Sequence, residues 1–212
     1  MSDLIAGLSP DFLSSFLAGM VVNFEIAAIA LVIGLAAGLL LALGRLTGGV
    51  VAAFSISVIS LMRAAPTFVV MFFLLNAIPR DATLFGMPFA LSGVMIVAVS
   101  LVPYSAAYVA DAGVDGLRYL QAGSLHGALL FLPNVTRAFF VLVMSSSAGA
   151  AIGVTEGITV ILRHAEQLPD FDDRLLLFAV GIVLFGIPLQ LGLAVMTWFQ
   201  RRFARPVAEQ AR

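Results

Sequence analysis

Long apolar runs alternate with short polar segments along the chain, a pattern typical of helices that cross a lipid bilayer. A bilayer span needs about 20 predominantly apolar residues. The apolar runs predict five transmembrane helices, at about residues 12–44, 51–78, 87–110, 133–155 and 175–199. We therefore expect an all-α integral membrane protein with one transmembrane domain that covers residues 1–212.

Composition supports a lipid environment and excludes several classes of function. The chain is 61% hydrophobic and 11% charged, whereas soluble domains carry about 25% charged residues. A net charge of -1 gives no electrostatic footprint for nucleic acid. The absence of cysteine excludes disulfides and thiol catalysis, and His126 and His164 lie too far apart in the sequence to suggest a histidine-rich metal site. We expect no catalytic residue, no metal and no cofactor bound by this chain.

Arginines are distributed unevenly between the two ends of the predicted spans. Leaving out Arg63, one side has seven arginines and the other has three. The larger set comprises Arg45, Arg118, Arg137 and the four arginines of the C-terminal tail. Arginine-rich segments stay in the cytoplasm. We therefore predict that the N-terminus is outside and that the C-terminus and the polar segment 111–132 are cytoplasmic.

Two segments with small residues at both ends suggest close helix packing. "GLAAG", residues 34–38, lies in the first span and is extended backwards by Ala30, and "GAAIG", residues 149–153, lies in the fourth. Small residues four apart let helix backbones approach each other closely. The pattern does not decide whether the contact lies within one chain or between chains.

A few polar residues interrupt the spans. Ser145, Ser146 and Ser147 follow one another in the fourth span, where they either bond back to their own helix or line a polar path. Glu25 is the one acid in the first span and lies either in a functional site or near the outer interface. Arg63 raises the same question in the second span, because an arginine can snorkel toward water.

The order of several short motifs resembles the membrane-spanning permease subunits of ATP-driven (ABC-type) importers for polar amino acids. That family has "RGTP" in its second span, where this chain has "RAAP" at 63–66. A family "YxAE" element corresponds to "YSAAYVAD", which ends at Asp111. "MSSSAGAAIGVTEG", residues 144–157, matches the family's fourth span, and an apolar-then-arginine ending follows near Arg205. The resemblance runs from about Phe16 to Arg205.

This resemblance implies a type I ABC-importer permease fold and two sets of site residues. The substrate path would include Ser145, Ser146, Ser147, Glu156, Asn76 and Tyr104. The contact with the ATPase would be a cytoplasmic loop, with Leu125, His126, Gly127 and Ala128 at the family's "EAA" signature. Here that loop is shorter than usual by roughly one to two dozen residues, so we expect reduced docking.

The resemblance also implies partners and a location. Because no "GxxxxGK[ST]" motif is present, ATP with Mg²⁺ would bind a separate ATPase chain. A second permease subunit, an extracytoplasmic solute-binding protein and a small polar solute such as an amino acid would complete the system, in a bacterial inner membrane. Two other hypotheses remain: a non-transporting membrane scaffold, and a small ion-coupled carrier or channel.

Overall fold

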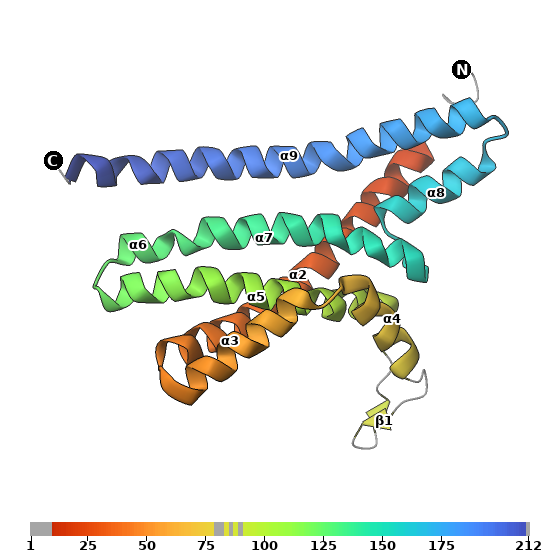
Figure 1. Ribbon diagram of the computed structural model, residues 1–212. Coiled ribbons are helices and arrows are strands. Elements are labelled where there is room, and N and C mark those ends of the chain that lie inside the picture. The colour runs from red at the N-terminus through yellow and green to blue at the C-terminus, as the bar shows by residue number, and fades with distance from the viewer. Residues whose placement is uncertain (1–9, 79–82, 85–86, 89–90, 211–212) are drawn as a thin grey trace.

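The chain forms long helices that lie side by side, with a short hairpin of strands at one edge (Figure 1). The computed structural model describes residues 10–78, 83–84, 87–88 and 91–210, except for the side chains of the two strands, of His126 and of residues beyond 198. In chain order the elements are α2 Pro10–Leu46, α3 Gly49–Ala64, α4 Thr67–Ala77, β1 Thr83–Leu84, β2 Met87–Pro88, α5 Gly93–Gln121, α6 Leu125–Leu129, α7 Phe131–Ser145, the 3-10 helix η1 Ser146–Ile152, α8 Gly157–Gln167 and α9 Phe171–Gln210. The strands pair antiparallel, with Thr83 opposite Pro88.

Within the described residues, four helical stretches are long and apolar enough to cross a membrane. They are Pro10–Leu46, Gly93–Gln121, Gly127–Ile152 and Phe171–Trp198. Helices α3 and α4 together meet the same criteria but meet at a 90° bend, so they count as a fifth span if they form one broken crossing. The prediction of several membrane helices is confirmed. The start of α2 and the end of α9 lie at opposite ends of the bundle (Figure 1).

The structure shifts the boundaries of several predicted spans. The second span is not continuous, because its helix stops at Ala64 and resumes at Thr67 after Pro66, which lacks a backbone N–H. The third span starts at Gly93, six residues after the predicted residue 87, because the Ser92 hydroxyl caps it by accepting from the Met95 N–H. Residues 111–121, predicted to be part of a loop, continue α5 as helix.

Helices α2 and α5 pack closely along a stripe of small residues. Ala30, Gly34, Gly38 and Ala42 of α2 are all buried. A Cβ on Gly34 would lie 2.0 Å from the Ser105 hydroxyl oxygen, and one on Gly38 would lie 2.6 Å from the Ala106 carbonyl oxygen. The prediction from "GLAAG" is therefore confirmed, with the contact inside this chain.

The second small-residue segment, "GAAIG", does not pack two helices together through both of its glycines. Residues 149–153 lie in the 3-10 helix and its end, where Gly149 is buried against Val97 and Val154. Gly153 adopts φ 83°, a left-handed conformation that glycine takes without strain, and it ends the helix. Helix packing through both glycines of "GAAIG" was therefore the wrong interpretation.

Candidate functional site

A cluster of buried polar side chains joins the start of α8 to the middle of α2. Its members are Asn23, Ser146, Glu156 and Thr159, and each is between 0% and 7% exposed. The Asn23 amide nitrogen donates to the Ser146 hydroxyl at 2.8 Å and to the Glu156 carboxylate at 3.0 Å. The Asn23 amide oxygen accepts from the Gly157 N–H at 3.0 Å. We call these four residues the buried polar cluster.

Glu156 holds the cluster together because it is the N-cap of α8. Its carboxylate accepts from the N–H groups of Ile158 and Thr159, at 3.0 and 2.8 Å. The Thr159 hydroxyl lies 3.0 Å from the same carboxylate and donates to the Val154 carbonyl oxygen at 2.6 Å. Partial positive charge at a helix N-terminus favours a carboxylate there. With the Asn23 amide, three N–H donors surround a carboxylate that has no exposed surface. The arrangement satisfies a buried charge without a cation among the described residues.

The approach of α2 to this turn depends on a glycine. A Cβ on Gly19 would lie 2.8 Å from the backbone carbon of Glu156 and from the nitrogen of Gly157. Contacts under 3.0 Å to backbone atoms leave no room for a larger residue. Gly19 and Asn23, one turn apart on α2, therefore fix the position of the turn before α8.

The structure brings together only part of the predicted substrate path. Ser146 and Glu156 meet through Asn23, and the Ser146 hydroxyl also donates to the Val143 carbonyl oxygen at 2.7 Å. Bonding back to the helix, one of the two expectations for the serine run, therefore holds for Ser146. Ser145 and Ser147 are half-buried at the junction of α7 and η1. Their place in a path stays a prediction.

Two further predicted path residues lie at the surface of the chain. Asn76, near the end of α4, is exposed and donates to the Phe72 carbonyl oxygen of its own helix at 2.7 Å. Tyr104 of α5 is 38% exposed and its ring centroid lies 6.2 Å from that of Tyr108. Neither has a described contact with the buried polar cluster, and their role in a path stays a prediction.

Sequence reasoning missed Asn23. It selected Glu25 as the notable polar residue of the first span, yet Glu25 is exposed and Asn23, two residues earlier, is fully buried. Two residues on a helix are 200° apart, so one of the pair must face outward when the other faces the core. The available signal was the spacing: Gly19, Asn23, Ala27 and Ala30 continue the stripe of small residues that ends at Gly38 and Ala42.

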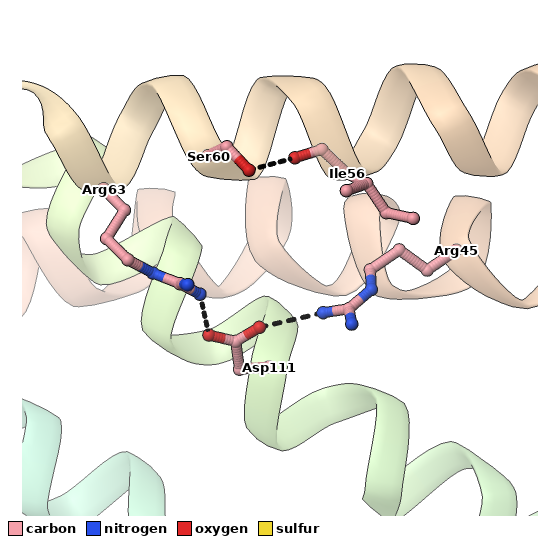
Figure 2. Close-up of polar contacts among 5 residues, drawn as sticks. All are labelled: Arg45, Ile56, Ser60, Arg63 and Asp111. Atoms are coloured by element: carbon pink, nitrogen blue, oxygen red, sulfur yellow. Dashed lines mark hydrogen bonds and ion pairs between the residues drawn. The ribbon is translucent and has the colours of Figure 1, made fainter.

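A second polar group lies where side chains of α2, α3 and α5 meet (Figure 2). The Asp111 carboxylate of α5 pairs with Arg45 near the end of α2 through one oxygen, at 2.8 Å, and with Arg63 near the end of α3 through the other. The side chains of Arg45, Asp111 and Arg63 are 30%, 47% and 62% exposed. We call these three residues the arginine–aspartate cluster. The cluster shows that the Arg63 side chain pairs with an acid on a neighbouring helix, and the depth of Arg63 in the membrane stays a prediction.

The predicted coupling loop is a helical hairpin. Helix α5 runs to Gln121, the chain turns at Gly123 with φ 74°, and the five-residue α6 packs back on α5. A Cβ on Gly127 would lie 2.5 Å from the ring of Tyr119, which is why this position has no room for the family's alanine unless the ring moves. Leu125 is exposed, Gly127 is buried and Ala128 is half-buried; the His126 side chain lies outside the description.

An open hollow with a volume of about 460 Å³ lies beside the tip of this hairpin. It is lined by Asp115, Arg118, Tyr119 and Ala122. Leu125 and Leu129 of α6 are 67% and 50% exposed, so the tip combines apolar and charged surface. Among the described residues, no group of three or more His, Cys, Asp or Glu side chains is placed to hold a metal ion.

Fold and site together define a multi-pass helical membrane protein. Its fold is similar to a solved structure, described as the crystal structure of an amino acid ABC transporter with histidines. The TM-score is 0.68 at 18% sequence identity, and the match covers 91% of this chain and 95% of the other. No family model and no curated protein matches the sequence. The likeness shows that this chain has a fold similar to that of this transporter.

Proposed function

We propose that this chain is a permease subunit of an ATP-driven importer that moves an amino acid or a similar small polar solute across a bacterial inner membrane. One observation carries the proposal: the fold likeness extends over nearly the whole of both chains. A match that covers one or two helices would fit many membrane proteins. The order of the "RAAP", "YSAAYVAD" and "IGVTEG" motifs along the chain supports it further.

ATP hydrolysis belongs, in this proposal, to a separate ATPase that docks at the hairpin of α5 and α6. The ATP-Mg is bound there and not by this chain. Because α6 has only five residues, the docking surface is small. Interfaces below about 1,000 Å² are usually weak or transient. We therefore infer that a second permease subunit, in a heterodimer with this chain, carries most of the coupling, and that an extracytoplasmic binding protein delivers the solute.

The membrane orientation follows from the arginine count. Arg45, Arg118 and the C-terminal tail would face the cytoplasm, and α8 with the start of α9 would face outward. Single-cysteine labelling tests this cleanly, because the chain has no cysteine of its own. A cysteine at Asp172 should react in intact cells, and one at Arg205 only after the membrane is opened to the cytoplasm. The reverse pattern would reject the orientation.

The test of the function is the composition and activity of the native complex. The tagged chain should be purified in mild detergent, its partners identified by mass spectrometry, and the complex reconstituted to measure ATP-driven uptake. An ATPase and a related permease should co-purify. The short α6 also fits a membrane scaffold that has lost transport; a complex that contains an ATPase but shows no solute-stimulated ATP hydrolysis would favour the scaffold. Normal stimulation by this chain with an ATPase alone would contradict the inferred heterodimer.

A further inference from the structure

The flank of α3 combines two features that lipid cannot cover. The first is the break between α3 and α4, where Ala64 and Pro66 are exposed and Ala65 is half-buried. The second is Arg63, whose side chain is 62% exposed beside that break. Non-helical backbone at membrane depth is tolerated where it is buried in protein or lines a water-filled cavity.

The position of Arg63 along α3 is compatible with a backbone at membrane depth. Helix α3 begins at Gly49, three residues after α2 ends, so this end of α3 lies at the same face of the bundle as the end of α2. Arg63 comes 14 residues later in the sequence. At 1.5 Å per residue its backbone lies about 21 Å along the helix, a distance shorter than the thickness of a hydrocarbon core, about 30 Å. Its guanidinium points back toward Asp111, which also holds Arg45 (Figure 2).

The arginine–aspartate cluster has an excess positive charge and N–H donors that Asp111 does not use. Two arginines and one aspartate give +2 and −1, a net charge of +1. A guanidinium has five N–H donors, and among the described residues Arg63 directs one nitrogen to Asp111. Asp111 thus fixes the position of the guanidinium without neutralising the cluster. Charged groups within membrane spans usually face a water-filled cavity or the interior of the bundle.

From this placement we propose that the flank of α3 that carries Ser60 and Arg63 lines the aqueous path of the importer, and that Arg63 binds a carboxylate group of the transported solute. A single carboxylate matches the net charge of the cluster, and its two oxygens match the paired N–H groups of a guanidinium. The inference rests on the proposed importer function and adds to it a solute class, small molecules with one negative group.

Two neighbouring positions on α3 allow the proposed water-facing side of the helix to be compared with a lipid-facing side. Ser60 lies one turn before Arg63 on the same side of the helix, with its hydroxyl bonded to the Ile56 carbonyl oxygen at 2.9 Å (Figure 2). Leu61, 73% exposed, lies two residues from Arg63 and so faces the opposite way. Ser60→Cys and Leu61→Cys place a thiol at nearly the same depth on the two faces, in a chain with no other cysteine.

The experiment measures how fast each thiol reacts, in membranes of cells that produce the chain, with an anionic and a cationic methanethiosulfonate reagent. We expect Ser60→Cys to react at least tenfold faster than Leu61→Cys. At Ser60→Cys the anionic reagent should react about tenfold faster than the cationic one, because the cluster carries a net positive charge nearby. Adding Arg63→Gln should bring the ratio of the two rates near one, and Arg63→Lys should preserve it.

Equally slow reaction at both positions would overturn the inference, because it would place this flank against lipid or within a dry interface. Fast reaction of Ser60→Cys with both reagents at equal rates would support a water-filled path but reject the anion site. Failure of this inference and failure of the proposed importer function give different results. If Ser60→Cys fails to react while the wild-type complex imports solute, only the inference falls. If the anion preference is found but no ATPase co-purifies and no uptake occurs, the importer function falls and the anion site stands.

The solute class is tested with histidine, its methyl ester and its amide as protecting probes. Histidine is chosen because it has one carboxylate and is the ligand named for the similar structure. Histidine at millimolar concentration should slow the anionic labelling of Ser60→Cys, and the ester and amide, which lack the negative group, should not. Equal protection by all three would reject recognition of the carboxylate. Absence of protection by histidine, by acetate and by succinate would reject a carboxylate site altogether.

Discussion

The two polar clusters of this protein differ in every physical respect that matters for their role. In the buried polar cluster, Glu156 has no exposed surface and three N–H donors within 3.0 Å. In the arginine–aspartate cluster, one half-exposed carboxylate is shared by two arginines. A polar group that is enclosed and fully bonded holds the fold together, whereas an open group with excess charge is available to a ligand. Each cluster includes residues of candidate spans, so the presence of a polar residue in a span would not by itself separate the two.

The largest effect on stability is expected from Glu156→Gln, which turns a buried hydrogen-bond acceptor into a donor. Glu156→Gln replaces one carboxylate oxygen with an NH₂ group that faces donors, and it removes the charge that caps α8. Leaving buried donors without a partner costs about 1–3 kcal/mol each, so we expect a loss of about 3 kcal/mol. At roughly 2–4 °C per kcal/mol for a chain of this size, the melting temperature should fall by roughly 6–12 °C.

The melting temperature can be followed by fluorescence-detected size exclusion after heating. Glu166→Gln on the exposed side of α8 is the matched control and should leave it unchanged. If Glu156→Gln melts normally and yet abolishes uptake, the buried polar cluster acts in transport instead of in folding, and the contrast between the two clusters disappears.

The second largest effect on stability is expected from Gly34→Ala, at the contact between α2 and α5. The Cβ of Gly34→Ala would lie 2.0 Å from the Ser105 hydroxyl oxygen and 2.5 Å from its Cβ, so one helix must move. Overpacking of this kind costs about 1–3 kcal/mol, which should lower thermal stability by several degrees. Ser105→Gly in the same chain should restore most of the loss.

Gly186→Ala is the control for the added methyl group, because a Cβ there meets nothing within 4 Å. It should be neutral or slightly stabilising, as alanine favours the helix over glycine. A loss equal to that of Gly34→Ala would show that backbone freedom, and not close packing, is what these glycines provide.

A smaller effect on stability is expected at the open cluster. Asp111→Asn is the same chemical change as Glu156→Gln, yet Asp111 is half exposed and exposed ion pairs contribute about 0–1 kcal/mol. Because Asp111 forms two such pairs, the melting temperature should move by no more than about 8 °C, while uptake falls because Arg63 loses its anchor. A large thermal loss from Asp111→Asn would mean that the open cluster also supports the fold.

The smallest effect is predicted at the tip of the hairpin. Changing Leu125, His126 and Leu129 to Ala should lower ATP-driven uptake less than about twofold, because α6 offers little surface for docking. Equivalent changes in the longer loop of the partner permease should abolish uptake. Complete loss from the changes in this chain would show that α6 is the main coupling element despite its length.

The sequence predicted the presence of membrane helices better than their ends or their contacts. Long apolar runs can hardly be stable outside lipid, so the spans followed from composition. The end of α5 was misjudged because residues 111–121 are polar by composition, whereas in the structure Gly113 packs on Ala42 and Gly116 packs on Phe131. Glycines that make room for another helix leave no apolar signal in the sequence.

The site was predictable only in part, for a related reason. Ser146 and Glu156 attracted attention as polar residues in an apolar context, and the structure places them in one cluster. Their partner Asn23 is more than 120 residues away in sequence, and pattern reading cannot supply that contact. Pairing of Arg63 and Arg45 with a common acid on α5 is likewise a property of the packed helices, which no local motif encodes.

The 3-10 helix η1 is a segment whose length along its axis can change. It runs for seven residues, and 3-10 runs longer than three or four residues are uncommon because their hydrogen bonds are poorer than those of an α-helix. A 3-10 helix rises about 2.0 Å per residue and an α-helix about 1.5 Å, so rewinding η1 would shorten it by about 3.5 Å. Such a change would let α7 move along its own axis while the hydrogen bond between Glu156 and Asn23 is kept.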